Sequence, residues 1–274
     1  MIEPYYLSAD FLALADESRQ RFITAEPFPH VVLDDFLPEW VLDNVLDEFP
    51  DPGEIPWKEF KQATSMKKLA TDGDSFFGDF TRYFFAQLNS AAFLQFLERL
   101  TGIESLIPDP YFEGGGLHQI EPGGFLKVHA DFNWHEKLRL DRRLNVLIYL
   151  NKDWQESFGG ALELWDKDMT YRAARILPIF NRCVVFATTD HSYHGHPEPL
   201  TCPPNRARRS MALYYYTNGR PEEERSAGHS TLYRERPTER IQRTRKAVER
   251  VAPPILLDAA KQLSHRRRSK QQPG

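Results

Sequence analysis

Apolar residues recur with helical spacing over most of the first hundred positions of the chain. Ser8-Ala9-Asp10 can cap a helix that begins near Phe11. An apolar stripe after Pro38 predicts a second helix, and residues 75–100 predict one or two more. We interpret the many aromatic side chains of that last stretch as core residues rather than cofactor contacts. A short strand and turn is expected at residues 29–37, between the first two helices.

From Pro108 onward the pattern changes to short apolar runs of the β type, separated by turns. The predicted strands are 116–121, 125–129, 144–150, 161–165, 174–177, 183–186 and 210–217. The intervening segments carry turn residues, such as Pro122-Gly123-Gly124 and Phe158-Gly159-Gly160. Many short strands at this spacing predict a sandwich or a barrel of the jelly-roll kind.

These patterns divide the chain into three regions. Residues 1–107 are predicted to be a mostly helical support region of the same domain as the strands, which fill residues 108–219. Residues 220–274 form a C-terminal extension, with a helix expected at 238–251 and a second short helix after Pro253-Pro254. The fold class is therefore mainly β with flanking helices (α+β).

Charge sets the C-terminal extension apart from the rest of the chain. The net charge is −4, yet residues 220–274 hold 14 Lys and Arg against 7 Asp and Glu. The remainder of the chain is therefore strongly acidic. The basic extension could bind an anionic partner, although a solvated helix with a basic end is the interpretation that we prefer. It shows no zinc finger, helix-turn-helix spacing or aromatic-basic interleaving, so no nucleic-acid partner is expected.

Composition excludes several other classes of protein. No apolar run approaches the roughly 20 residues that span a bilayer, and the N-terminal segment lacks the features of a secretory signal. The two cysteines, Cys183 and Cys202, do not make a disulfide framework or a cysteine-based zinc site. We therefore expect a cytoplasmic protein without a membrane partner. The oligomeric state cannot be read from the sequence.

The histidines cluster in a pattern that favours a metal centre. His129 and Asp131 lie two residues apart at the end of a predicted strand, so both side chains can point to one face. His191, His194 and His196 follow the predicted strand 183–186 and offer a third ligand. Two histidines and one carboxylate leave coordination positions open, as non-haem iron(II) requires. A catalytic zinc with three protein ligands is the alternative.

An arginine pair strengthens this interpretation. Arg208-Arg209-Ser210 opens a strand that is otherwise apolar and rich in tyrosine. An arginine entering such a strand is costly unless it meets an anion, and its planar guanidinium suits a carboxylate. An exposed arginine at the start of the strand is the alternative.

The same segments carry a resemblance to a known family. Residues 122–131 (PGGFLKVHAD), 144–154 (LNVLIYLNKDW), 159–164 (GGALEL), 186–194 (FATTDHSYH) and Arg209-Ser210 occur in order and at matching spacing. Together they resemble the prolyl-4-hydroxylase-like branch of the 2-oxoglutarate/iron(II) dioxygenases. Residues 148–154 are especially similar to the oxygen-sensing prolyl hydroxylases. The resemblance covers a little over a third of the chain and implies a double-stranded β-helix (jelly-roll, cupin-like) core.

The resemblance also implies roles for individual residues. His129, Asp131 and His194 match the iron ligands, while Arg209 and Tyr149 match the partners of the distal carboxylate of 2-oxoglutarate. Two further residues, Asn145 and Leu147, share a strand face with Tyr149 and are expected to line the same pocket. Many relatives have His-x-Val-x-Pro where this chain has His194-Gly195-His196-Pro197, so His196 and His191 stay rival ligands to His194.

The implied activity is that of a hydroxylase that uses Fe(II), 2-oxoglutarate and dioxygen, with ascorbate as an additional reductant. The substrate is expected to be a prolyl or other residue of a protein or peptide, or a small metabolite. Arg142 and Arg143 either meet an anionic substrate or are solvated. Two other functions remain open, namely a non-catalytic metal-binding jelly roll and a binding module for an anionic partner.

Overall fold

The computed structural model describes residues 10–243 and divides the chain into two compact units between Arg234 and Glu235. The second unit is described only up to residue 243, and its residues 237–243 are helical. The rest of the predicted helix at 238–251, and the one after Pro253-Pro254, lie outside the described residues. Among the residues described, no helix is both long and apolar enough to cross a bilayer.

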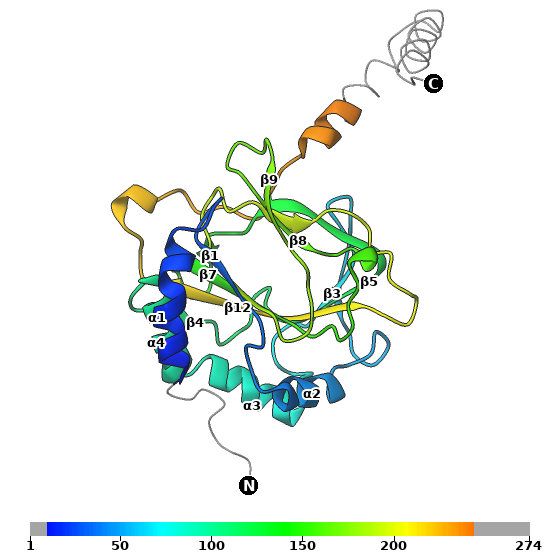
Figure 1. The fold of residues 1–274 in the computed structure, drawn as a ribbon, viewed down its shortest axis with the longest axis horizontal. Coiled ribbons are helices and arrows are strands. Elements are labelled where there is room, and N and C mark those ends of the chain that lie inside the picture. Colours follow the sequence, from blue (N-terminus) through cyan, green and yellow to red (C-terminus); the bar gives the residue numbers. More distant parts are fainter. Residues whose placement is uncertain (1–9, 244–274) are drawn as a thin grey trace, which may run out of the picture. The chain divides into compact units, whose positions relative to one another are not determined.

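The first unit is built on one large antiparallel sheet that rolls up into a barrel (Figure 1). Its strands follow the order β1-β10-β7-β12-β5-β11-β8-β9. The bounds along this path are β1 His30–Leu33, β10 Cys183–Ala187, β7 Leu140–Tyr149, β12 Arg208–Thr217, β5 Gly116–Ala130, β11 His194–His196, β8 Leu162–Trp165 and β9 Arg172–Ile176. Because β5 belongs to both halves of the barrel, this is a jelly-roll, double-stranded β-helix core, as predicted.

Strand β5 bends at the Pro122-Gly123-Gly124 segment, where Gly123 adopts a φ of +81°. Before the bend, residues 116–120 pair with β12; after it, Leu126 and His129 pair with β11. The sequence predicted two strands with a turn here, whereas the backbone continues as one bent strand. The bend carries the chain from one half of the barrel to the other and delivers His129 to the second half.

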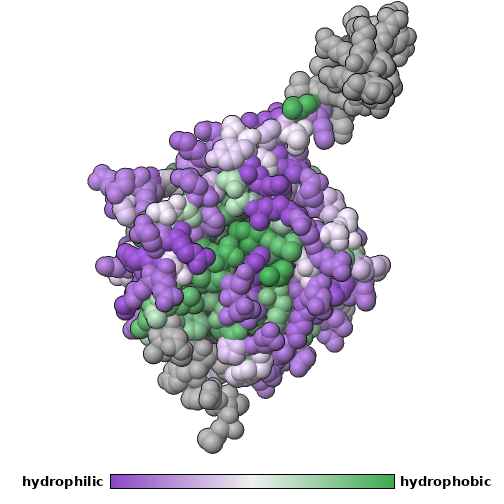
Figure 2. Space-filling view, viewed as in Figure 1, coloured by the Kyte–Doolittle hydropathy of each residue, from purple (hydrophilic) through white to green (hydrophobic). Residues whose placement is uncertain are grey.

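Helices cover the outer face of one half of the barrel (Figure 1). They are α1 Asp10–Ile23, α2 Glu39–Asp47, α3 Asp79–Leu88 and α4 Ala91–Thr101, and all four lie where helices were predicted. Alternation along the strands sends Val146, Val185 and Leu213 into the core beneath these helices. The residues between them in sequence face the interior of the barrel. Figure 2 shows hydrophobic residues at the centre of this view, framed by hydrophilic ones.

One part of the N-terminal region is not helical. Residues 58–70 form a hairpin of β2 (Lys58–Gln62) and β3 (Ser65–Ala70), and β3 pairs with β5. The prediction of a mostly helical region was wrong here, because the hairpin is polar and largely exposed and has no clear apolar alternation. The hairpin therefore extends the sheet beside the barrel interior.

Short elements complete the unit. They are β4 Ile107–Pro108, β6 Trp134–His135, β13 Leu232–Tyr233 and the 3-10 helices Glu156–Phe158 and Glu222–Glu224. Strand β13 pairs with the end of β5, with Tyr233 opposite His129 and their rings 5.5 Å apart. The first part of the predicted extension, up to Arg234, thus belongs to the same compact unit as the barrel.

Candidate metal centre and cofactor cavity

Two strands of the barrel bring His129 and His194 together. His129 lies near the end of β5, His194 begins β11, and the two residues are directly opposite in the antiparallel pair. Residues paired in this way project their side chains to the same face of a sheet. The imidazole centroids are 4.5 Å apart, and both side chains are buried. Pairing of the backbone therefore sets the distance between these two candidate ligands.

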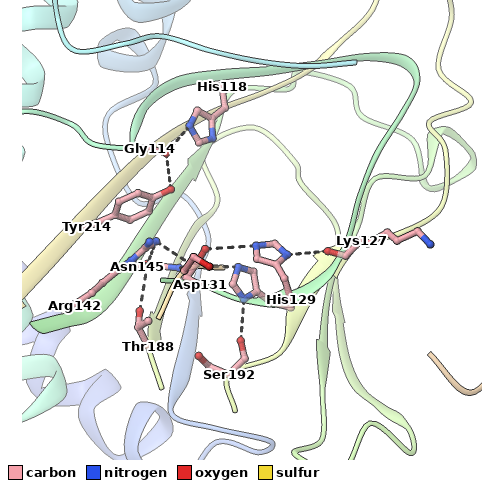
Figure 3. A network of polar contacts seen from close by, with 12 residues as sticks. Gly114, His118, Lys127, His129, Asp131, Arg142, Asn145, Thr188, Ser192 and Tyr214 are labelled. Atoms are coloured by element: carbon pink, nitrogen blue, oxygen red, sulfur yellow. Dashed lines mark hydrogen bonds and ion pairs between the residues drawn. The ribbon is translucent and has the colours of Figure 1, made fainter. Parts of the chain in front are cut away.

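Hydrogen bonds to the backbone fix the orientation of both rings. Nδ1 of His129 lies 2.8 Å from the carbonyl oxygen of Lys127 (Figure 3). Nδ1 of His194 lies 2.9 Å from the carbonyl oxygen of Ser192. A carbonyl only accepts, so each Nδ1 carries the proton and each Nε2 keeps a free lone pair. Burial, more than any other factor, lowers the pKa of His194 to about 4, which keeps this imidazole neutral. Neutral imidazoles with free Nε2 atoms are suited to bind a metal.

Asp131 provides the carboxylate between the two imidazoles. Its Oδ1 lies 3.5 Å from Nε2 of His129, and its Oδ2 lies 3.5 Å from Nε2 of His194. Oδ2 also accepts hydrogen bonds from Nη2 of Arg142 at 3.0 Å and Nδ2 of Asn145 at 2.6 Å (Figure 3). Burial would raise the pKa of Asp131, but Arg142, His194 and His129 outweigh it and hold the pKa well below its usual range. The carboxylate is therefore ionised and held in place.

These three residues fit a metal ion. One ligand atom from each of His129, Asp131 and His194 lies within 4.8 Å of the others. They are the only such group of at least three His, Cys, Asp or Glu ligands among residues 10–243. Two imidazoles and one carboxylate with no fourth protein ligand is the donor set of mononuclear non-haem iron(II). The structure thus brings together the three residues that the sequence predicted.

The rival histidines do not join this group. The side chain of His191 is exposed to solvent. His196 is buried two residues beyond His194, and neither of its ring nitrogens has a hydrogen-bond partner among the described residues. Burial, followed by the nearby Arg208 and Lys68, holds the pKa of His196 well below its usual value, so its ring is neutral.

The three candidate ligands line a cavity inside the barrel. Asn145 and Leu147, which were predicted to lie near the cofactor, are on its wall. Four side chains that bear nitrogen, besides the candidate ligands and Asn145, also line it: Lys68, His118, His196 and Arg208. The polar groups on its wall are mainly hydrogen-bond donors.

The prediction for Arg209 was wrong, because the guanidinium in the cavity is that of Arg208. Arg208 is 5% exposed, and its Nη2 donates to the hydroxyl of Tyr149 at 3.2 Å. The Arg209 side chain leaves on the opposite face of β12, where it contacts Gln119 and Asp51. Successive residues on a strand point to opposite faces, so one position decides which arginine enters the barrel.

A glycine makes room for the buried arginine. Gly160 adopts a φ of +72°, and a Cβ atom added there would lie 2.6 Å from Leu200 and 3.0 Å from Cδ of Arg208. The Gly160 carbonyl accepts a hydrogen bond of 2.7 Å from Nε of Arg208. Together with the Tyr149 hydroxyl, this contact aims the guanidinium. Tyr149 is fully buried, and burial raises its pKa, so the hydroxyl is neutral.

Two charged residues of the site were not assigned a place in it from the sequence. Arg142 was left as a contact for an anionic substrate or a solvated residue, but it is buried against Asp131 and stacks over the Tyr214 ring at 3.4 Å. Lys68 was not singled out at all, because it lies on the hairpin that the pattern did not predict. Burial, more than any other factor, lowers the pKa of Lys68 to about 8. Strand pairing between β3 and β5 is the only signal that would have located it.

Comparison with known proteins agrees with this site. Residues 115–216 match the family model of the 2OG-Fe(II) oxygenase superfamily. Among solved structures, the chain is similar to a prolyl hydroxylase from Trichoplax adhaerens in complex with a hypoxia inducible factor oxygen degradation domain peptide fragment. The identity is 18% over 76% of this chain and 90% of that chain, with a TM-score of 0.56. No curated protein sequence matches the chain.

Two further solved structures share the fold. A prolyl-4-hydroxylase from Pseudomonas putida is 16% identical over 75% of this chain and 100% of that chain, with a TM-score of 0.54. The non-heme alpha-ketoglutarate-dependent epimerase SnoN from nogalamycin biosynthesis is 13% identical over 76% of this chain and 84% of that chain, with a TM-score of 0.50. At such identities the likeness shows a common fold.

The barrel and its three-ligand group define a double-stranded β-helix protein with a mononuclear metal site. The family match extends from just before β5 to near the end of β12 and so includes all three candidate ligands. Over residues 115–216 the barrel therefore matches the 2OG-Fe(II) oxygenase superfamily, and this match supports a dioxygenase that uses Fe(II) and 2-oxoglutarate. The resemblance found in the sequence is thereby confirmed.

Proposed function

We propose that the protein hydroxylates an unactivated C–H bond of its substrate at an iron held by His129, Asp131 and His194. The observation that carries this proposal is the convergence of their ligand atoms within 4.8 Å, in the same cavity as a buried arginine. A structural metal site has no need of that arginine, which is why we favour an enzyme over a non-catalytic jelly roll.

The chain's own groups are arranged to hold the iron before the substrate arrives. The carbonyls of Lys127 and Ser192 keep both Nε2 lone pairs directed toward the site. Arg142 and Asn145 occupy Oδ2 of Asp131, so this carboxylate cannot turn away from the imidazoles. Removal of such supporting contacts typically lowers metal affinity or activity by about 10- to 100-fold.

Arg208 and Tyr149 are proposed to hold the distal carboxylate of 2-oxoglutarate. A buried guanidinium is costly without an anion, and the contacts of Arg208 among the described residues are to neutral oxygens, a carbonyl and a hydroxyl. A carboxylate fits its planar donors, and the Tyr149 hydroxyl can donate to the same anion. Asn145 and Leu147 form the cavity wall beside this path. When bound, Fe(II) and 2-oxoglutarate supply the activation of dioxygen, and ascorbate is expected to keep the iron reduced.

The substrate is proposed to be a prolyl or other residue of a protein or peptide, or a small metabolite. The similar structures include a prolyl hydroxylase with a peptide fragment and an epimerase from nogalamycin biosynthesis, which support one alternative each. In either case the cavity residues position one C–H bond at the open side of the metal and exclude water around it.

Metal-dependent binding of 2-oxoglutarate tests this function. Calorimetry under anaerobic conditions should show binding to the Fe(II)-loaded protein and none to the metal-free protein. The His129→Ala variant should lose binding, whereas His191→Ala, at an exposed histidine on the loop before β11, should keep it. If the loaded wild-type protein does not bind 2-oxoglutarate and releases no succinate in air, the proposal is wrong.

A further inference from the structure

Lys68 places a positive charge in the cavity that no protein group neutralises. It lies on β3, opposite Ile120 of β5, and its side chain is on the cavity wall. Its ammonium group has no hydrogen bond or ion pair among residues 10–243, and its one recorded contact is with the Phe60 ring, 5.0 Å from the centroid. Lys68 is partly buried, and a cation that is partly removed from water without an anion is unfavourable, which points to a missing partner.

The cofactors do not provide that partner. The formal charges of Fe(II) and Arg208 balance those of Asp131 and the two carboxylates of 2-oxoglutarate. Arg142, which contacts Asp131, and Lys68, which lines the cavity, are then in excess. A cavity that is loaded with its cofactors and still carries excess positive charge favours an anionic substrate.

Arg142 is less suited than Lys68 to bind that anion. Its Nη2 is engaged by Asp131 and Asn145, and its guanidinium lies between the rings of Phe132 and Tyr214, 4.4 and 3.4 Å from their centroids. Lys68, in contrast, has three ammonium donors and a flexible stem on the cavity wall. It is therefore the cation that can reach an incoming ligand.

Lys68 lies across β5 from Arg208, because both residues pair with Ile120. After burial, Asp131 has the largest influence on the Lys68 ammonium, ahead of Arg208. Arg208 is fixed by Gly160 and Tyr149, toward the distal end of the proposed 2-oxoglutarate site. An anion bound to Lys68 would lie in the same cavity that His129, Asp131 and His194 line.

His196 is a second, independent sign of a polar ligand. Its ring is 3% exposed and lines the same cavity, yet both nitrogens lack a partner among the described residues. A buried polar group without a hydrogen bond is unfavourable, so these two nitrogens call for a partner such as a ligand. The neutral His196 ring can donate one hydrogen bond to a carboxylate.

We propose that the primary substrate is a small carboxylic acid, whose carboxylate is bound by Lys68 with a second hydrogen bond from His196. This rests on the proposed function and deepens it, because it selects the small-molecule alternative and names the recognised group. The carboxylate holds one end of the molecule, so that a C–H bond a few atoms away is presented to the metal.

Matched acids and amides test the proposal. Protein loaded with Fe(II) and 2-oxoglutarate is titrated without oxygen with the proteinogenic amino acids, their N-acetyl derivatives and their primary amides. At least one acid should bind, and its amide should bind about 10- to 100-fold more weakly, as the loss of a charge-assisted hydrogen bond implies. The same acid should then give succinate when oxygen is admitted.

Variants assign that preference to Lys68. Lys68→Gln should weaken binding of the acid until its affinity equals that of the amide. The Kd for 2-oxoglutarate should change by less than about threefold. His196→Val should give a smaller loss for the acid. Lys61→Gln, on the same hairpin but exposed, should change neither affinity.

Three results would overturn the proposal. The first is that no acid in the panel binds more tightly than its amide, and the second is that a capped prolyl peptide without a carboxylate binds as well as any acid. In the third, Lys68→Gln weakens 2-oxoglutarate as much as it weakens the acid, which would make Lys68 part of the cofactor site. Each of these leaves metal-dependent 2-oxoglutarate binding intact, so failure of the wider function would be recognised separately.

Discussion

The two faces of the same barrel strands differ sharply in chemistry. The outer faces of β7, β10 and β12 carry Val146, Val185 and Leu213 against the helices, and this face is almost wholly apolar. At the alternate positions of these strands, the inner face carries groups such as Asn145 and Arg208, which contribute to the cavity wall. The outer face therefore supplies stability through burial, whereas the inner face keeps polar groups whose partners are ligands. Substitutions on the two faces should separate stability from function.

The largest expected effect is on the outer face. Phe93 in α4 is fully buried and packs against Tyr215 of β12, with ring centroids 6.1 Å apart. Phe93→Ala should lower the free energy of unfolding by about 3–5 kcal/mol, through lost burial and a cavity. Urea denaturation measures the change. Ile23→Ala, at an exposed apolar position of α1, is the control and should change stability by less than about 0.5 kcal/mol.

The Phe93→Ala variant also tests whether a change on the outer face affects cofactor binding on the inner face. Where Phe93→Ala still folds, its affinity for 2-oxoglutarate should equal that of the wild type, because Phe93 does not line the cavity. A large loss of cofactor affinity in the folded variant would mean that the two faces are not independent.

An intermediate effect is expected on the inner face, from a pair of neighbouring residues that differ only in the face they occupy. Arg208→Ala should raise the Kd for 2-oxoglutarate about 10- to 100-fold, through loss of charge-assisted hydrogen bonds to the distal carboxylate. Arg209→Ala should leave this Kd within about threefold of the wild-type value, because the guanidinium of Arg209 faces Asp51. Calorimetry on the metal-loaded variants measures both, and the reverse ranking would restore the role first expected for Arg209.

The arginine pair also shows what limits inference from the sequence. The metal ligands were predictable because His129 and Asp131 lie two residues apart and therefore share a face. The strand after Arg209 is apolar on both faces, with Met211 and Leu213 alternating with Ala212 and Tyr214. Because neither face is polar, the alternation does not indicate which face points into the barrel. The pattern therefore could not decide which of the two adjacent arginines enters the cavity.

The hairpin of β2 and β3 marks a second limit. The four helices under the barrel have apolar stripes, which is why each was predicted close to its observed position. Strand β2 is exposed along most of its length and is held by pairing with β3. Strand β3 in turn pairs with β5, which is distant in the sequence. The position of Lys68 on the cavity wall therefore depends on long-range strand pairing, which the local pattern of apolar residues does not predict.

The smallest expected effect concerns how a helix on the outer face is held. The carboxylate of Glu48 accepts hydrogen bonds from the backbone N–H groups of Phe80 and Thr81, at 3.0 and 2.7 Å. The Glu48 carboxylate thus caps the first turn of α3, because the N-cap residue Gly78 has no side chain that could do so. Burial would raise the pKa of Glu48, but its contacts with Thr81 and Phe80 outweigh it and lower the pKa.

Glu48→Gln should therefore reduce the free energy of unfolding by about 0.5–2 kcal/mol at neutral pH. Since the pKa is lower in the folded state, the contribution of the carboxylate is present above its unfolded pKa and is lost as the pH falls through the folded value. The stability difference between wild type and variant should thus shrink in acid. Denaturation curves at neutral and acidic pH measure it, and Glu104→Gln, at an exposed position, provides the control. A difference that stays constant with pH would show that Glu48 acts through packing rather than through its charge at the start of α3.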